Sequence, residues 1–205
     1  MSSPAHIRNV VLVGHNGSGK TSLAEALLFR AGVISRPGTI EKGSTALDHD
    51  PEERARQQSV SLSLASFDWN DHRINLLDTP GYADFAGEVI SALQVVEGAV
   101  VVVDSVAGVE VGTEIAWQHL DELGLPRIVV INKMNRENAN WPKVLASLES
   151  SFGARFVPLQ LPVGNAHEFK GVYDVVRGVA SLGNEGKPGD VPGAVATDAG
   201  TRRDA

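Results

Sequence analysis

Polar and apolar positions along the chain follow two periods, which predict strands that alternate with helices. Largely apolar runs at residues 7–13, 99–103 and 127–131 have the composition of parallel strands covered on both faces. Apolar residues at helical spacing occur between and after these runs, and they predict helices after residue 20 and over residues 85–96, 113–123 and 142–152. The alternation predicts an α/β fold with a mostly parallel sheet and helices on both faces.

A hairpin and a weaker C-terminal pattern complete this prediction. Residues 60–69 and 73–78 read as two antiparallel strands joined by the turn-forming residues 70–72. Short strand patterns recur at residues 156–163 and 171–176, and residues 183–205 lack periodicity, so we expect a disordered tail there. Residues 33–59 form a long polar loop. Loops of this length in a compact domain are usually functional or mobile, although an ordinary solvated linker remains the alternative.

A glycine-rich segment follows the first predicted strand and opens the first predicted helix. Its residues are Gly14, His15, Asn16, Gly17, Ser18, Gly19, Lys20 and Thr21, and they match the phosphate-loop pattern G-x-x-x-x-G-K-T. Glycines let backbone N–H groups crowd a phosphate, and the positive end of the helix faces the same anion. In this motif the lysine reaches the β- and γ-phosphates and the threonine hydroxyl ligates Mg²⁺. The sequence therefore predicts a P-loop NTPase.

Two further motifs follow directly after predicted strands. Asp78, Thr79, Pro80 and Gly81 end the hairpin, and Asn132, Lys133 and Asn135 end the 127–131 run. Ligands of open parallel sheets bind at the carboxyl ends of the strands, which is where all three motifs fall. An aspartate there can hold Mg²⁺ through water, and a glycine N–H can approach a terminal phosphate. A plain Pro-Gly turn is the alternative for the second motif, and a surface loop for the third.

Composition narrows the class of protein. The 205 residues carry a formal net charge of -7 and no cysteine, which disfavours a basic nucleic-acid surface and excludes disulfides and cysteine metal sites. The N-terminus has no signal-peptide shape, and the apolar runs are too short to span a membrane. We therefore expect a cytoplasmic monomer without a membrane partner or a sequence-specific nucleic-acid partner.

These motifs, in this order, resemble those of the G domain of translational GTPases. Within this family the chain is most similar to elongation factor G, and in particular to the branch of second paralogues called elongation factor G-like. Residues 104–109, 156–164 and 168–172 also resemble this family, the latter two at the entry to a subdomain inserted in the G domain. The likeness covers roughly residues 7 to 182. It implies binding of GTP and GDP with Mg²⁺, slow GTP hydrolysis without a ribosome, and a ribosomal partner for full-length proteins.

The resemblance also implies roles for individual residues. Lys20, Gly81 and Tyr82 are the expected catalytic residues, and Thr21, Ser61 and Asp78 are the expected metal ligands. Asn132 would brace the phosphate loop, and the stem of Lys133 would lie on the base. The expected nucleotide-binding residues are Gly14, His15, Asn16, Gly17, Ser18, Gly19, Lys20, Thr21, Ser22, Asp78, Thr79, Pro80, Gly81, Asn132, Lys133 and Asn135.

Four features depart from the family pattern. Ser61 stands where we align the metal-ligating threonine of the first switch, and Tyr82 stands where a histidine usually positions the attacking water. A phenol is a poor base near neutral pH, which predicts slow hydrolysis. Asn135 replaces the aspartate that accepts from both N–H groups of the guanine edge, and an amide can accept from one only. The chain also ends inside the inserted subdomain, so we expect a fragment, a truncated product or a degenerate copy.

These observations predict a G-domain core over residues 1–162, the start of the inserted subdomain over 163–182 and the disordered tail over 183–205. A catalytically weak or silent nucleotide-binding fragment is the alternative function. An unrelated P-loop enzyme, such as a small ATP-dependent kinase, is a further alternative that the order of the motifs disfavours.

Overall fold

The computed structural model describes residues 3–47, 59, 61–82, 86–183, 186–190 and 193–203. The chain divides into two compact units. The first unit comprises residues 1–104 and 110–132, and the second comprises residues 105–109 and 133–205. Each unit has its own sheet.

The first unit is built on a five-stranded sheet in the order β2-β3-β1-β4-β5. Its strands are β1 (Ile7–Val13), β2 (Ser63–Trp69), β3 (His72–Asp78), β4 (Gly98–Asp104) and β5 (Arg127–Asn132). β1 runs parallel to β3 and β4, and β4 runs parallel to β5, whereas β2 pairs antiparallel with β3. Asn70 and Asp71 join β2 to β3 with positive φ angles of 46° and 61°, as a tight hairpin turn requires. The mostly parallel sheet is confirmed.

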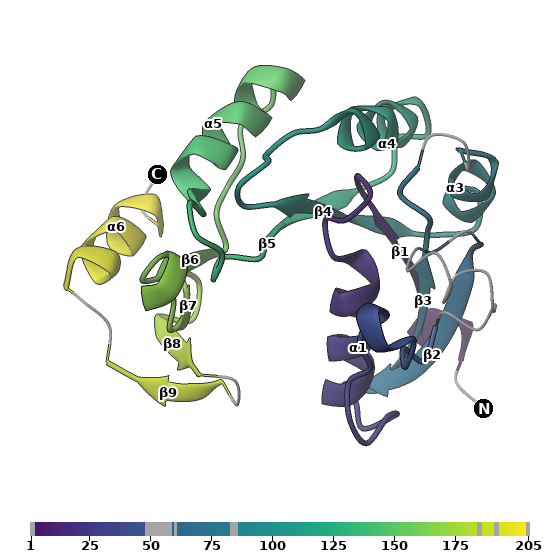
Figure 1. Cartoon of the computed structure of the whole chain (residues 1–205), viewed down its shortest axis with the longest axis horizontal. Coiled ribbons are helices and arrows are strands. Elements are labelled where there is room, and N and C mark those ends of the chain that lie inside the picture. Colours follow the sequence, from purple (N-terminus) through teal and green to yellow (C-terminus); the bar gives the residue numbers. More distant parts are fainter. Residues whose placement is uncertain are drawn as a thin grey trace. The chain divides into compact units, whose positions relative to one another are not determined.

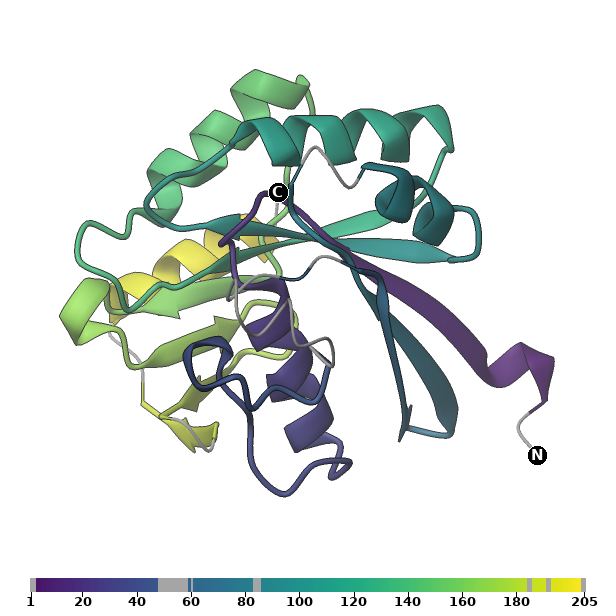
Figure 2. The same ribbon diagram turned by 45° about the vertical axis from the view of Figure 1, so that its right-hand side comes forward.

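Helices cover both faces of this sheet (Figures 1 and 2). α1 (Lys20–Arg30) lies on one face, and α3 (Ala86–Leu93) and α4 (Val111–Glu122) lie on the other. The core on the α1 side contains Leu12, Leu28 and Leu76, each no more than 2% exposed. Short 3-10 helices occupy Pro4–His6 and Ile40–Lys42. Because β1, β3 and β4 are parallel, their carboxyl ends and the loops that follow them lie at the same edge of the sheet.

The second unit combines helices with a small antiparallel sheet. α5 (Trp141–Phe152) and the 3-10 helix Ala166–Glu168 accompany four strands in the order β6-β7-β8-β9. The elements are β6 (Gln160–Val163), β7 (Gly171–Asp174), β8 (Val179–Leu182), β9 (Lys187–Gly189) and α6 (Gly193–Arg203). The core of this unit combines Leu161, Val175 and Ala199, against which Trp141 and Val195 pack.

The C-terminal part differs from the disordered tail that we expect from the sequence. Among the described residues beyond 183, Lys187–Gly189 pair with β8 and Gly193–Arg203 form α6. The physical reason is tertiary packing, because Ala199 is fully buried against Leu161. Compactness also divides the chain after Asn132 rather than near residue 162, since Trp141 packs in the C-terminal core.

Part of the expected first-switch loop lies outside the described residues. The structure describes residues 33–47 and Ser59, but not residues 48–58. Among the described residues, no helix combines the length and apolar character that crossing a membrane requires.

Candidate functional site

The glycine-rich segment connects β1 to α1, and its glycines are needed for its shape. Gly14 has a φ of 138°, and a Cβ atom there would lie 2.3 Å from the Val102 carbonyl oxygen in β4. Gly19 has a φ of 97° and precedes the first residue of α1. No side chain caps that helix end, so its first N–H groups remain open to an anion. The loop therefore has the tight, glycine-dependent backbone that the motif predicts.

Lys20 lies inside this loop and is only 6% exposed. Its Nζ donates to the carbonyl oxygens of Gly14 at 2.9 Å and His15 at 3.0 Å. Burial lowers the pKa of Lys20 from 10.5 to about 8, while the nearby Asp78 carboxylate opposes that shift. A buried ammonium that donates to carbonyl groups is well placed to gain from a phosphate anion.

Other parts of the first unit brace the loop. Asn132, at the end of β5, donates from Nδ2 to the Ser18 carbonyl oxygen at 3.0 Å, as the expected bracing role requires. The Ser18 hydroxyl is buried and has no hydrogen-bond partner among the described residues. Ser22 lies exposed on the first turn of α1. The loop backbone is thus held from β5, while the Ser18 hydroxyl makes no hydrogen bond with the described residues.

The second motif packs directly against the loop. Thr79 Oγ1 donates to the Leu12 carbonyl oxygen at 2.7 Å, which ties the motif to β1. A Cβ atom on Gly81 would lie 2.6 Å from both the Asn16 backbone and Lys20 Nζ, so only glycine fits there. The next residue, Tyr82, accepts a hydrogen bond at its phenol oxygen from Asn16 Nδ2 at 2.6 Å.

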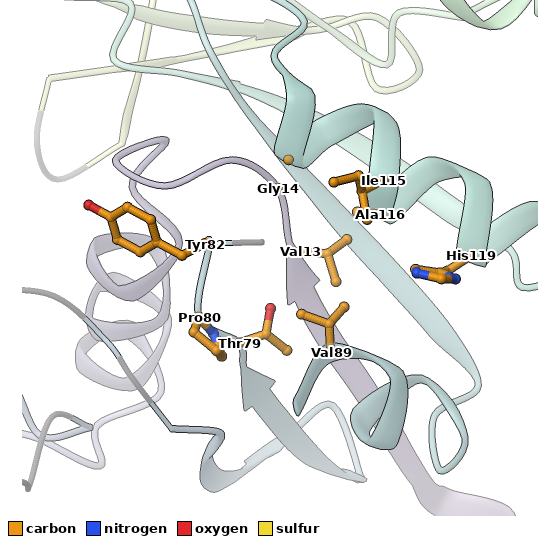
Figure 3. Close-up of a pocket in the computed structure, with 11 residues that line it drawn as sticks. Val13, Gly14, Thr79, Pro80, Tyr82, Val89, Ile115, Ala116 and His119 are labelled. Carbon is orange, nitrogen blue, oxygen red and sulfur yellow. The ribbon is translucent and has the colours of Figure 1, made fainter. Parts of the chain in front are cut away.

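A small cavity of about 30 Å³ lies between this motif, β1, α3 and α4 (Figure 3). Val13, Pro80, Val89, Ile115 and Ala116 give it a mainly apolar lining. A space of this size holds about one water molecule. It is too small for a nucleotide, and the open cradle above the loop is the better candidate for phosphate binding.

The hydroxyl groups that could hold a divalent cation differ in part from the expected set. Thr21 Oγ1 lies 3.1 Å from Ser59 Oγ, whereas Ser61 is exposed at the start of the segment that enters β2. Mg²⁺ holds oxygen ligands at about 2.1 Å in an octahedron, so adjacent ligands lie about 3 Å apart. The Thr21–Ser59 pair matches that separation, and the buried Asp78 carboxylate beside Lys20 adds an acidic ligand. Thr21, Ser59 and Asp78 therefore form a donor set that fits Mg²⁺, and Ser61 stays a predicted ligand.

The third motif crosses from one unit to the other. Asn132 ends the first unit, and Lys133 begins the second with a φ of 62°. Within the second unit, Ser105 Oγ donates to the Lys133 carbonyl oxygen at 2.9 Å, and the Ala166 N–H donates to the Met134 carbonyl oxygen at 3.1 Å. Asn135 is exposed and forms no side-chain hydrogen bond with the described residues. Its amide is available to a ligand.

Glu25 is a residue that the sequence reasoning did not single out. It lies on α1, is 1% exposed, and accepts from the Gly38 N–H at 2.7 Å and the Ala46 N–H at 2.5 Å. The neighbouring Leu47 is also buried in the core. Glu25 therefore anchors the described beginning of the long loop to the helix that starts at Lys20. The sequence feature that could have identified Glu25 is the position of an acidic residue on the inner face of a predicted helix.

His15 connects the phosphate loop to the start of α4, a contact that the motif alone does not predict. Its Nδ1 accepts from the Gly112 N–H at 3.2 Å, and its Nε2 lies 3.5 Å from a Glu110 carboxylate oxygen. A Cβ atom on Gly112 would lie 2.8 Å from the His15 Cα atom. The loop is consequently supported by β4, β5 and α4 within the first unit.

Comparison with known proteins assigns this arrangement to a family. The family described as the elongation factor Tu GTP binding domain matches residues 5–193. The chain belongs to this family. Similar proteins include an elongation factor G-like protein of Mycobacterium tuberculosis, 43% identical over 80% of this chain and 23% of that protein. Elongation factor G 2 of Streptomyces coelicolor is 39% identical over 96% of this chain and 29% of that protein.

A mitochondrial ribosome-releasing factor 2 of Yarrowia lipolytica is also similar, with 38% identity over 88% of this chain and 23% of that protein. A crystal structure of a Thermus thermophilus protein matches with a TM-score of 0.91 and 39% identity, over 98% of this chain and 30% of that one. The resemblance to the G domain of an elongation factor G-like GTPase and the P-loop NTPase fold are therefore confirmed. The chain spans 23% to 30% of the length of these relatives.

Proposed function

We propose that this GTP-binding domain binds GTP and GDP together with Mg²⁺ and hydrolyses GTP slowly. The observation that supports this most directly is the packing of Gly81 against Lys20 and Asn16, which brings the second motif onto the phosphate loop. Lys20 and Gly81 then lie on the same side of the loop, where a terminal phosphate has both a cation and a backbone N–H. Family membership supports the choice of a guanine nucleotide.

The protein's own groups divide the work of binding. The open N–H groups at the start of α1 face the phosphates, and Lys20 exchanges two carbonyl partners for phosphate oxygens. Thr21, Ser59 and Asp78 would hold Mg²⁺, which neutralises charge on the phosphates when bound. Because phosphoryl transfer needs little covalent chemistry from the protein, positioning and charge supply most of the rate.

Slow turnover follows from Tyr82. Its phenol is a weak base near neutral pH and is bonded to Asn16, so it is poorly suited to accept a proton from the attacking water.

The names of the relatives connect them with translation elongation and ribosome release. On that basis we propose that the ribosome stimulates hydrolysis in a protein that carries this domain.

Single-turnover hydrolysis of GTP tests the proposal. The protein is mixed with radiolabelled GTP and Mg²⁺, with and without ribosomes, and phosphate release is followed over time. Slow release that depends on Mg²⁺ and is lost in Lys20→Ala is the expected result. ATP hydrolysis at an equal or higher rate would contradict the choice of a guanine nucleotide.

A domain that binds nucleotide without hydrolysing it is the second candidate. It is favoured by two residues together, since Tyr82 replaces the usual water-positioning histidine and Asn135 replaces the usual base-reading aspartate. Such a domain would bind GDP and GTP in the titration described in the Discussion but release no phosphate, with or without ribosomes.

A further inference from the structure

The contact between Asn16 and Tyr82 joins two parts of the first unit that are 66 residues apart. Asn16 is the third residue of the phosphate loop, and Tyr82 directly follows the glycine of the second motif. Asn16 Nδ2 lies 2.6 Å from the phenol oxygen, and both side chains are half-buried. In Figure 3 the Tyr82 hydroxyl points away from Val89 and His119 at the far end of the cavity. The phenol oxygen is therefore hydrogen-bonded to the phosphate loop and does not point into the core.

The direction of this hydrogen bond leaves the phenol proton unused. The Asn16 amide supplies the hydrogen, and Tyr82 supplies the acceptor oxygen. A phenol has one O–H donor besides its acceptor capacity. Tyr82 makes no other hydrogen bond with the described residues. Donation by the amide also polarises the phenol and makes its O–H a stronger donor, because hydrogen bonds in a chain reinforce one another.

The neighbouring residues identify what this donor can meet. The Cα atom of Gly81 lies against Lys20 Nζ and the Asn16 backbone, as shown by the 2.6 Å distances that a Cβ atom would have to them. Lys20 is the loop cation, and in this motif it reaches the β- and γ-phosphates. Tyr82 thus extends from the residue beside that cation to the third residue of the loop. The phosphates that the loop lysine reaches in this motif include the γ-phosphate, which GDP lacks.

From this geometry we infer that Tyr82 donates a hydrogen bond to the terminal phosphate of a bound nucleoside triphosphate, and that Asn16 is the residue that positions it. The pair discriminates the triphosphate from the diphosphate state. This inference rests on the proposed nucleotide binding and assigns the phenol a donor role in place of a basic one. It also gives a function to Asn16, to which the phosphate-loop pattern itself assigns no residue type.

Equilibrium titration with two nucleotides tests the inference. GDP and a non-hydrolysable GTP analogue are titrated with Mg²⁺ onto the wild-type protein and onto Tyr82→Phe, Asn16→Ala and the double variant. Phenylalanine keeps the ring and removes only the donor. Tyr173→Phe is the matched control, because Tyr173 lies on β7 in the other unit.

The expected result is a selective loss of affinity for the GTP analogue. Hydrogen bonds to charged groups are strong enough that Tyr82→Phe should weaken analogue binding about tenfold to a hundredfold. Asn16→Ala should weaken it about threefold to tenfold, because the phenol keeps its donor but loses its fixed position. In both variants the affinity for GDP should fall less than the affinity for the analogue, and the double variant should be no worse than Tyr82→Phe, as expected for coupled residues.

Two results would overturn the inference while leaving nucleotide binding intact. One is an equal change in GDP and analogue affinity, which would give the pair a structural role only. The other is unchanged analogue affinity in Tyr82→Phe. If the wild-type protein binds neither nucleotide, the proposed function itself fails, and the inference fails with it.

Discussion

The phosphate loop of the first unit and the predicted base-reading motif of the second unit are held in different ways. In the first unit, Lys20 is buried, Gly14 and Gly81 allow no side chain, and Asn132 holds the loop backbone. In the second unit, Lys133 and Met134 are fixed through their carbonyl groups, but Asn135 is exposed and its amide makes no bond with the described residues. The expected phosphate contacts therefore rest on backbone and packing, whereas the expected base contact rests on the exposed Asn135 side chain.

This difference indicates which property of nucleotide binding a substitution in each motif would change. Removing the Lys20 cation should affect guanine and xanthine nucleotides alike, because both carry phosphates. A change at Asn135 should affect only the choice between bases. The following experiments separate these two effects.

Replacing Lys20 should have the largest effect. Lys20→Ala removes the only side-chain cation of the phosphate loop and should weaken GDP and GTP binding by at least about tenfold. The loss should be equal for guanine and xanthine nucleotides. Fluorescence titration with labelled nucleotides measures it, and Lys143→Ala on α5 serves as an exposed control. Unchanged affinity would exclude the loop from the site.

Replacing Asn135 should change the choice of base instead. Guanine presents two donors, N1–H and the 2-amino group, and Asn135 can accept from only one of them. Xanthine has a carbonyl group in place of the 2-amino group, so an asparagine can accept from N1–H and donate to that carbonyl. A mismatched polar contact costs about 1–3 kcal/mol, or roughly fivefold to a hundredfold in affinity.

We therefore expect wild-type protein to bind GDP weakly relative to XDP, and Asn135→Asp to restore the preference for GDP. The ratio of the two dissociation constants is the measurement. Asn165→Asp, an exposed change in the same unit, is the control. A strong GDP preference in the wild type that does not change in Asn135→Asp would show that another group reads the base.

The pH dependence of binding should reveal the buried lysine. Burial lowers the pKa of Lys20 to about 8, so the free protein loses that charge as the pH rises through 8. Bound phosphate favours the protonated form, and binding must then take up a proton. GDP affinity should fall about tenfold between pH 7 and pH 9, in proportion to the fraction of neutral lysine. Calorimetry in buffers of different ionisation enthalpy would measure the uptake, which Lys20→Ala should abolish.

The same pKa affects folding in the opposite direction. The folded pKa of Lys20 lies below its unfolded value of 10.5, so the unfolded chain binds more protons between about pH 8 and 10.5. This residue's unfavourable contribution is complete below pH 8 and is relieved as the pH rises through that window. A rise in pH above 8 therefore weakens nucleotide binding but removes a destabilising contribution to folding.

Replacing Glu25 should lower the stability of the fold and have the smallest effect on the choice of nucleotide. Glu25→Gln retains the shape but replaces one acceptor with an amide that faces a backbone N–H. Loss of a buried hydrogen bond to a charged group lowers the free energy of unfolding by about 1–3 kcal/mol. Urea unfolding measures the change, and Glu114→Gln, an exposed change on α4, is the control. The ratio of XDP to GDP affinity should not change.

Much of this architecture could be predicted from the sequence. Apolar runs located β1, β4 and β5 closely, and helical spacing located α4 and α5, because these elements bury one face or both faces in the core. The three motifs were found at the ends of strands, where the parallel sheet places them. Local pattern was sufficient for these elements because the residues that define each one are close in sequence.

Other features depend on contacts that local pattern does not contain. Ser59 and Ser61 are two residues apart and carry the same hydroxyl group, so the local sequence does not show which of them lies beside Thr21. α6 is weakly patterned and forms where Ala199 packs against Leu161. Glu25 bonds to N–H groups 13 and 21 residues away, and Asn16 bonds to Tyr82 66 residues away. These pairings follow from the fold rather than from the neighbouring sequence.

The central claim is that this domain keeps the phosphate contacts of its family and alters the base contact. The most direct measurement is a competition titration of GDP, XDP and ATP against a labelled nucleotide on the wild-type protein with Mg²⁺. We expect both GDP and XDP to compete, with XDP at least as effective as GDP and ATP weaker than either. Competition by ATP as strong as that of XDP, or no competition by any of the three, would contradict the account.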